Sequence, residues 1–424
     1  MPVDPARRAS LDVLTAALTS KAGLEAALEG QGLGKLSPQD RAFARALVMA
    51  TLRHLGPIDK LLNPCLQREP PEAVRMILRL GAAQMFHLET PAYAAVNSSV
   101  ALAEAMPSTR GFKALVNAVL RRLGREPARE ADAEDYAPPW LFARWRAAFG
   151  EANARAIAGV IPQEPATDLT PRAAAEAPAL AELLEADLLP GGQLRRAGRG
   201  RIEEWPGFEE GRWWVQDAAA AIPARLLASQ AGETVVDLCA APGGKALQLA
   251  ATGAAVTAVD RSAGRLSRLT DALARTGLKA ETVVADAERW EDTRQFDAVL
   301  LDAPCTSSGT FRRNADVLWT LRPADIAKLA ELQSRLLDAA AKRVKPGSRL
   351  VYCVCSLEPE EGEAQVRAFL RRHPDFTTLA AAAGDSGAPT ESLTPEGWLR
   401  VLPHQLDGGL DGFFIARLVR KAAG

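Results

Sequence analysis

The sequence predicts an α/β region preceded by an all-helical region. Up to about residue 130, apolar residues recur at helical spacing. From Trp213 onward, short β-rich runs alternate with helical stretches, which is typical of parallel strands covered by helices on both faces. The segment between them is rich in proline, alanine and glycine, and its fold does not follow from its residues. We expect it to be either a small mixed domain or a linker.

The size of the chain also favours several domains. Single cores stop growing near ~250–300 residues, and this chain has 424. We therefore divide it into a helical domain at 1–130, a small intermediate domain or linker at 131–207, and an α/β domain at 208–424.

The composition indicates a folded protein without membrane segments. Apolar residues make up 48% and charged residues 24% of the chain, the balance of a soluble protein. No apolar run reaches the ~18–20 residues of a membrane helix. The N-terminus is a poor signal peptide, and the odd number of cysteines, five, favours reduced thiols. We expect a cytoplasmic protein.

The helical region carries recognisable helix signals. Ser37, Pro38 and Asp40 combine an N-cap, a first-turn proline and an acidic residue, which predicts a helix start. The cleanest apolar stripe joins Phe112, Leu115, Val116, Val119, Leu120 and Leu123. His54 and His87 lie within predicted helices, and we interpret both as packing or surface residues.

Two groups of cations stand out against a net charge of −1. The first comprises Arg110, Lys113, Arg121, Arg122, Arg125 and Arg129, and the second Arg195, Arg196, Arg199 and Arg201. Such groups are usually solvated surfaces, and the alternative is contact with nucleic-acid phosphates. The net charge alone argues mildly against nucleic acid.

Five successive strands and a closing hairpin are predicted in the α/β domain. The strands span 234–239, 255–260, 281–285, 296–301 and 349–355, and the hairpin joins 398–402 to 413–419. Helical stretches are expected near residues 245, 264, 323 and 359.

The first of these strands leads into a turn of small residues. The run Cys239, Ala240, Ala241, Pro242, Gly243, Gly244 and Lys245 lets the backbone approach a ligand at a helix start. Asp260 ends the next strand, where an acidic residue commonly holds a ribose diol. Asp286 follows the third strand and is placed to accept a hydrogen bond from an adenine amino group.

These carboxylates have other interpretations. Aspartates often simply end strands. A dinucleotide dehydrogenase would carry Gly-x-Gly-x-x-Gly in the turn, whereas this turn reads Ala-Pro-Gly-Gly-Lys. Taken with the cysteines described next, the pattern favours S-adenosylmethionine as the cofactor.

Cysteines end the fourth and fifth strands. Asp302 and Cys305 follow the fourth, and Cys355 ends the fifth. If these strands are neighbours, Cys305 and Cys355 face one pocket. Cys353 points to the same side as Cys355 but lies deeper, so we interpret Cys353 as packing and Cys355 as the exposed thiol.

Three alternatives compete for these thiols. Each cysteine alone is most often a small buried residue. A metal site with Cys305, Cys353 and Cys355 lacks a fourth ligand nearby, and we expect no metal. A Cys–His hydrolase lacks a histidine in a suitable context.

Two pocket thiols suit methylation of cytosine carbon 5. That carbon is a poor nucleophile until a thiolate adds to ring carbon 6 and creates an enamine. A second thiol or a base can then assist release. Asp302 is placed to bond the exocyclic amine or ring nitrogen 3 and stabilise the adduct. Methylation of an exocyclic nitrogen needs no such nucleophile.

Four motifs follow one another along the α/β domain. They are Asp237-Leu-Cys-Ala-Ala-Pro-Gly-Gly-Lys245, Asp302-Ala-Pro-Cys-Thr-Ser-Ser-Gly309, Cys353-Val-Cys-Ser-Leu-Glu-Pro-Glu-Glu361 and Asp411-Gly-Phe-Phe414. Together they resemble the Nol/Nop/Sun RNA cytosine-5 methyltransferases. The resemblance covers roughly residues 208–420 and implies a Rossmann-like class I methyltransferase domain. It implies that Cys355 is the nucleophile and that Cys305 aids release. It also implies that residues 239–245, Asp260, Asp286 and Asp302 line the cofactor pocket. The family's Thr-Cys-Ser motif reads Val354-Cys-Ser here, without the threonine.

The helical region is similar to the NusB-like domain of some bacterial members. Asp40-Arg-Ala-Phe-Ala, Tyr93-Ala-Ala-Val-Asn-Ser-Ser-Val-Ala-Leu-Ala103 and Val116-Asn-Ala-Val-Leu-Arg-Arg122 carry this more diffuse likeness. It implies small-subunit ribosomal RNA as the partner, and we expect the helical domain to bind RNA. Separately, we expect a monomer. The alternatives are a tRNA cytosine-5 methyltransferase and a non-catalytic rRNA-binding assembly factor.

Overall fold

The protein was analysed as a computed structural model, which describes residues 3–19, 23–30, 32–125, 130–198 and 200–422. Within those ranges, no helix combines the length and the apolar character needed to cross a membrane. The chain forms two compact units, one of residues 1–164 and 311–321, the other of residues 165–310 and 322–424.

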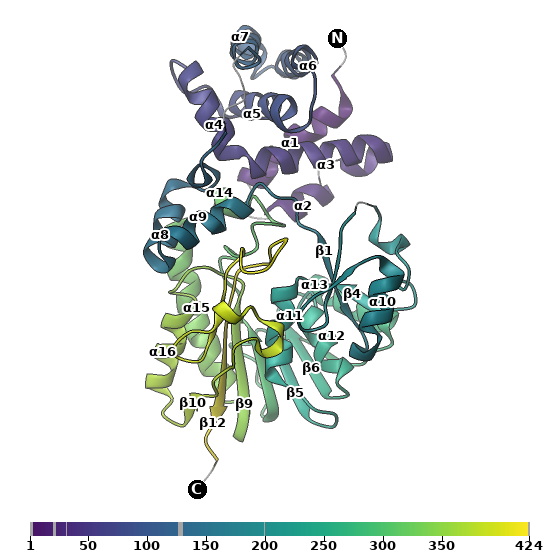
Figure 1. The fold of residues 1–424 in the computed structure, drawn as a ribbon, viewed down its shortest axis with the longest axis vertical. Coiled ribbons are helices and arrows are strands. Elements are labelled where there is room, and N and C mark those ends of the chain that lie inside the picture. The colour runs from purple at the N-terminus through teal and green to yellow at the C-terminus, as the bar shows by residue number, and fades with distance from the viewer. Residues whose placement is uncertain (1–2, 20–22, 31, 126–129, 199, 423–424) are drawn as a thin grey trace. The chain divides into compact units, whose positions relative to one another are not determined.

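The first unit is built from helices (Figure 1). They are α1 (Pro5–Thr19), α2 (Gly23–Gly30), α3 (Pro38–Arg53), α4 (Leu55–Leu62), α5 (Glu72–His87), α6 (Ala92–Ala105), α7 (Lys113–Leu123), α8 (Pro139–Phe149), α9 (Glu151–Val160) and α14 (Val317–Thr320). One apolar core joins α1 to α7 and includes the fully buried side chains of Leu14, Leu47, Ile58 and Met76.

The predicted helix signals are confirmed. Ser37 caps α3, because its Oγ accepts a hydrogen bond from the backbone N–H of Asp40 at 3.1 Å, and Pro38 opens the helix. Helix α7 buries Val116, Val119, Leu120 and Leu123 and leaves Lys113, Arg121 and Arg122 exposed. Phe112 and Leu115, which belong to the same predicted stripe, are half-buried. Arg129 of the first cation group lies outside the described residues.

His54 and His87 are half-buried and stack on each other, with ring centroids 3.6 Å apart. Burial lowers the pKa of each imidazole to about 4. Two neutral rings in face-to-face contact agree with a packing role.

The segment 311–321 joins the helical unit although it is flanked on both sides by the second unit. Phe311 packs on Trp145, with ring centroids 5.9 Å apart. Asp316 accepts a hydrogen bond from the backbone of Leu24 at 2.9 Å, and the Trp319 indole donates to the carbonyl of Leu52 at 3.2 Å. The sequence prediction places segment 311–321 in the α/β domain at 208–424, because no residue near it in the sequence indicates contact with the helical region.

The structure divides the predicted intermediate segment between the two units. Helices α8 and α9 belong to the helical unit, whereas the remainder belongs to the second unit. There it forms a small antiparallel sheet in the order β2-β3-β1-β4, with helix α10 beside it. The elements are β1 (Thr167–Pro171), α10 (Ala177–Leu184), β2 (Asp187–Leu188), β3 (Leu194–Arg196) and β4 (Trp213–Val215).

The second cation group is only partly solvated, because Arg201 is exposed whereas Arg195 and Arg196 are held by other contacts. Arg195 is buried and forms an ion pair with Asp168 at 2.8 Å. Arg196 donates to the carbonyl of Leu184 at 2.8 Å and stacks on the ring of Trp205. Two of its cations therefore stabilise the small sheet, and Arg199 lies outside the described residues.

The main sheet of the second unit has the order β10-β12-β9-β8-β5-β6-β7, with β11 pairing to β12. Its strands are β5 (Thr234–Leu238), β6 (Ala255–Asp260), β7 (Glu281–Val284), β8 (Phe296–Asp302), β9 (Val344–Val354), β10 (Phe376–Thr378), β11 (Leu399–Val401) and β12 (Phe413–Arg420). The predicted strands are confirmed to within a few residues, except that β9 begins five residues earlier and β10 was missed. The predicted hairpin is confirmed as β11 and β12, and β12 also pairs antiparallel with β9.

Helices cover both faces of this sheet (Figure 1). Along β9, Leu350, Tyr352 and Val354 face α15 and α16, whereas Val351 and Cys353 face α11 and α12. This alternation is the two-residue period of a strand. The helices are α11 (Ala218–Leu227), α12 (Gly244–Ala251), α13 (Ala263–Thr276), α15 (Pro323–Ala341) and α16 (Glu363–Arg372).

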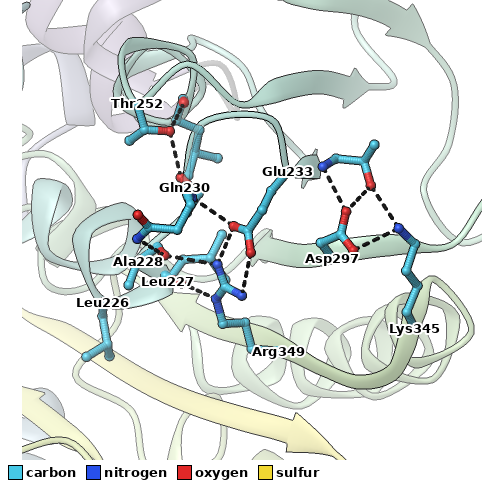
Figure 2. A network of polar contacts seen from close by, with 12 residues as sticks. Leu226, Leu227, Ala228, Gln230, Glu233, Thr252, Asp297, Lys345 and Arg349 are labelled. Carbon is cyan, nitrogen blue, oxygen red and sulfur yellow. Dashed lines mark hydrogen bonds and ion pairs between the residues drawn. The ribbon is translucent and has the colours of Figure 1, made fainter.

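Ion pairs fasten the strands near the starts of β5, β8 and β9 (Figure 2). Arg349 pairs with Glu233 and also donates to the carbonyl of Leu227 at 2.6 Å. Asp297 accepts a hydrogen bond from Lys345 at 2.8 Å. This hydrogen bond is the largest of several causes that lower the pKa of the Asp297 carboxyl. These contacts lie at the amino ends of the parallel strands, opposite the edge that holds the motifs.

Candidate active site

Two neighbouring parallel strands bring the predicted cysteines together. Strand β8 pairs with β9, with Asp302 opposite Cys353. The loop after β8 carries Cys305, and Cys355 follows the last residue of β9. Their Sγ atoms lie 3.5 Å apart. The structure therefore places both thiols in one site at the carboxyl edge of the sheet.

The two thiols differ in their electrostatic surroundings. A hydrogen bond from Cys305 lowers the pKa of Cys355, whereas that same bond, burial and the charge of Glu361 raise the pKa of Cys305. Ser307 Oγ lies 3.6 Å from Cys355 Sγ. The pKa of Cys355 is thus lowered and that of Cys305 raised, so Cys355 is the thiol that ionises first.

Asp302 forms a partly buried polar contact beside the thiols. Its Oδ2 accepts a hydrogen bond from Lys245 Nζ at 2.7 Å, and its Oδ1 lies 3.4 Å from Cys353 Sγ. The charge of Asp302 raises the pKa of Lys245 against the opposing effect of burial. The Lys245 ammonium also lies 5.2 Å from the ring centroid of Phe413. Cys353 is fully buried, in agreement with its interpretation as a packing residue.

The small-residue turn links β5 to α12 in a constrained conformation. Gly243 has a φ of 115°, and a Cβ there would lie 2.5 Å from Leu269 Cδ1. Cys239 also adopts a left-handed backbone, with a φ of 64°, and burial raises the pKa of its thiol. The backbone of the turn, at the start of α12, thus lies close to the ends of β5 and β6.

The two predicted nucleoside-binding carboxylates occupy different environments. Asp260 is buried, and its oxygens accept hydrogen bonds from the backbone N–H groups of Ala241 at 3.1 Å and Ser262 at 2.9 Å. Asp286 is exposed and accepts a hydrogen bond from the backbone of Glu288 at 3.0 Å. Asp260 therefore shapes the turn directly, whereas no hydrogen bond or ion pair in the described structure joins Asp286 to the other predicted site residues.

Asp237 is a site residue to which we had assigned no role. It lies in β5 next to the turn, is fully buried, and neither carboxyl oxygen has a hydrogen-bond partner in the described structure. Burial, followed by the nearby charge of Asp302, raises its pKa well above the usual range. An unpaired buried carboxyl is costly unless a bound molecule supplies a donor. The α-ammonium group of S-adenosylmethionine is a donor of this kind, so the turn fits that cofactor.

Among the described parts of the chain, no group of three or more His, Cys, Asp or Glu side chains is arranged to hold a metal ion. The close thiols and the Lys245–Asp302 pair instead suit nucleophilic chemistry on a base.

Known proteins share both parts of this architecture. A model of the 16S rRNA methyltransferase RsmB/F family matches residues 224–419, and a NusB family model matches residues 4–125. The ribosomal RNA small subunit methyltransferase B of Cronobacter sakazakii is 35% identical to this chain, over 91% of this chain and 92% of its own length. The protein of the same name from Sodalis glossinidius is 37% identical, over 93% of this chain and 94% of its own length. The crystal structure of PH0851 superposes with a TM-score of 0.78 and 26% identity, covering 99% of both chains.

The fold and the site define a class I methyltransferase joined to a NusB-like helical domain. The chain belongs to the RsmB/F family of 16S rRNA methyltransferases. It is an S-adenosylmethionine-dependent RNA cytosine-5 methyltransferase, and the predicted fold class, cofactor and enzyme class are confirmed.

Replacing Asp260 by alanine is expected to weaken S-adenosylmethionine binding. Loss of a hydrogen bond to a charged group costs ~1.5–3 kcal/mol, or roughly tenfold to a hundredfold in Kd. Titration calorimetry on the folded variant measures this change. The control is Asp292→Ala, which removes a carboxylate paired with Arg294. An unchanged Kd for Asp260→Ala would contradict the assignment of this residue to the cofactor.

Proposed function

We propose that this enzyme methylates a cytosine of 16S small-subunit rRNA through a covalent bond to Cys355. The observation that carries the proposal is the 3.5 Å approach of the Cys305 and Cys355 sulfurs beside the Lys245–Asp302 pair. A cysteine that only fills space in the core would not need a second thiol beside it. Methyl transfer to an exocyclic nitrogen would need neither thiol.

The reaction follows from the different states of the two thiols. The Cys355 thiolate adds to carbon 6 of the cytosine, and the electron pair displaced toward carbon 5 forms the bond to the methyl group. S-adenosylmethionine supplies that methyl as a sulfonium substituent. The carbon 5 proton then leaves to a base, and the electrons of that C–H bond expel Cys355. Cys305 lies close enough to exchange a proton with Cys355 and so assist this release.

Asp302 recognises the cytosine base in this proposal. Lys245 holds one of its oxygens, so the carboxylate is fixed in orientation. A fixed acceptor suits the exocyclic amine of cytosine, which donates a hydrogen bond, and disfavours uracil, which presents a carbonyl there. The turn at 239–245, Asp237, Asp260 and Asp286 hold the cofactor in this proposal.

Relatives named small-subunit methyltransferases match nearly the whole chain, helical region included. That full-length match favours 16S rRNA over tRNA. We further propose that the enzyme acts as a monomer in the cytoplasm, where its five free cysteines stay reduced.

Bisulfite sequencing of RNA from a deletion strain tests the substrate. We expect one cytosine of 16S rRNA to lose its methylation and to regain it when the wild-type chain is restored. Loss confined to a tRNA would show that the substrate is tRNA. An unchanged map across all RNAs would favour a non-catalytic assembly factor.

The exposed end of α7 is expected to bind rRNA phosphates. Arg121, Arg122 and Arg125 are all exposed. Phosphate contacts add affinity and salt dependence with little sequence information. Replacing all three by alanine should raise the RNA Kd and flatten its dependence on salt, with cofactor binding unchanged.

A matched variant controls for the loss of three charges. Arg367, Arg371 and Arg372 are exposed on α16, and their replacement by alanine removes the same charge elsewhere. Filter binding across a salt series compares the two variants. Equal RNA affinity and salt slope in both would exclude α7 from the RNA-binding surface.

A further inference from the structure

Glu361 is a buried carboxylate that contacts both cysteine loops. It lies between β9 and α16 and has no exposed surface. Its oxygens accept hydrogen bonds from Thr306 N at 3.0 Å, Thr306 Oγ1 at 2.5 Å and Ser356 Oγ at 2.5 Å. Gln333 on α15 donates a further bond at 2.9 Å. All of these partners are donors, so together they satisfy an ionised carboxylate.

The positions of these donors connect Glu361 to the thiols. Thr306 directly follows Cys305, and Ser356 directly follows Cys355. One carboxylate therefore fixes the chain immediately after each cysteine. Gln333 also donates to the carbonyl of Pro304 at 2.9 Å, so the residue before Cys305 is held as well.

Further bonds join the two loops above this carboxylate. The backbone N–H of Gly309 donates to the carbonyl of Cys355 at 3.0 Å. Ser308 Oγ accepts a hydrogen bond from Leu357 N at 2.9 Å. These bonds bring the loops together, but none of them carries a charge. Glu361 is the ionisable group among these loop contacts.

The charge of Glu361 acts on Cys305. It is among the causes that raise the pKa of Cys305, after the bond to Cys355 and burial. Glu361 accepts a hydrogen bond from the backbone N–H of Thr306, directly after Cys305, and contacts the Cys355 loop through the Ser356 hydroxyl. A buried negative charge near Cys305 disfavours a thiolate there.

We propose that Glu361 is a positioning residue that holds the two cysteine loops in register and keeps Cys305 protonated, so that Cys355 is the thiolate. This rests on the proposed function, because it assumes that Cys355 attacks and Cys305 assists. A carboxylate buried only for stability would hold the loops equally well and would leave the choice of thiol unchanged.

The test is Glu361→Gln in the full chain, which keeps the shape of the side chain and removes its charge. The rate of iodoacetamide alkylation is measured at Cys305 and at Cys355 separately, by peptide mass spectrometry across a pH series. We expect the Cys305 midpoint to fall by at least about one pH unit, so that the preference for Cys355 drops roughly tenfold. The kcat should fall while the KM for S-adenosylmethionine stays near wild type.

Two further variants separate charge from general destabilisation. Ser356→Ala removes one donor but leaves the Glu361 charge, so it should lower kcat without moving the Cys305 midpoint. Glu233→Gln weakens a structural ion pair with Arg349, away from the thiols (Figure 2), and should change neither quantity. If Glu361→Gln does not fold, Ser356→Ala still decides, because an unchanged kcat there would overturn the positioning role.

Two results would overturn the proposal. The first is a Glu361→Gln protein that alkylates Cys355 and Cys305 with wild-type rates and midpoints. The second is a Ser356→Ala protein that shifts the Cys305 midpoint as far as Glu361→Gln does. Because alkylation needs no RNA, either result leaves the covalent mechanism itself to be judged by the cysteine variants.

Discussion

Cys355→Ala is expected to lose methyl transfer by at least roughly 10³-fold, equivalent to about 4 kcal/mol of transition-state stabilisation. Without the thiolate, carbon 5 of cytosine is not activated, and Cys305 remains a protonated donor. Single-turnover transfer of a radiolabelled methyl group to RNA measures the loss. Binding of S-adenosylmethionine should stay near wild type, because the Cys355 side chain is not assigned to the cofactor.

The matched control for this substitution is Cys65→Ala. Cys65 is also a partly buried cysteine outside any disulfide, but it belongs to the helical unit. The Cys65→Ala enzyme should methylate RNA at the wild-type rate. A Cys355→Ala enzyme that retains normal activity would show that transfer needs no covalent bond at this residue.

Cys305→Ala is expected to have a smaller effect of a different kind. Cys355 still attacks, but release of the methylated base slows because the thiol 3.5 Å away is missing. The enzyme should therefore accumulate as a covalent complex with RNA, visible as a slower band on a denaturing gel. Turnover should fall by at least roughly 10²-fold, or about 2.7 kcal/mol, while a first methyl transfer remains.

The two substitutions also test each other. The double variant Cys305→Ala, Cys355→Ala should form no complex, because the attacking group is absent. A complex with Cys355→Ala but not with Cys305→Ala would reverse the roles of the two residues.

Much of the site was predictable because parallel strands place successive loops at one edge of a sheet. Cys305, Cys355 and Asp302 follow strands with strong apolar character, so their meeting depends only on β8 and β9 being neighbours. Sequence reasoning could not find the role of Asp237, because burial without a partner is visible only in three dimensions. Glu361 lay within a recognised motif, but its bonds to both loops depend on the folding of the residues after each cysteine.

The unpredicted parts of the fold have physical causes as well. Arg195 was grouped with surface cations because composition does not reveal Asp168, which pairs with it from 27 positions earlier. Segment 311–321 follows the Cys305 loop in sequence, yet Phe311 is buried and Trp319 partly buried in the helical unit. Local patterns predict elements, but not which distant surface an aromatic side chain will join.

The most direct test of the central claim is to identify the sulfur that bonds to the RNA. In an RNA whose target cytosine carries fluorine at carbon 5, no proton can leave from that carbon, so the covalent complex persists after methyl transfer. Trypsin cleavage separates the cysteines, because Cys305 falls in peptide 295–312 and Cys355 in peptide 350–367. Fragmentation within the second peptide distinguishes Cys355 from Cys353. We predict a methylated fluorocytosine on Cys355 in the wild-type enzyme; a modification on Cys305 or Cys353, or no covalent complex at all, would contradict the account.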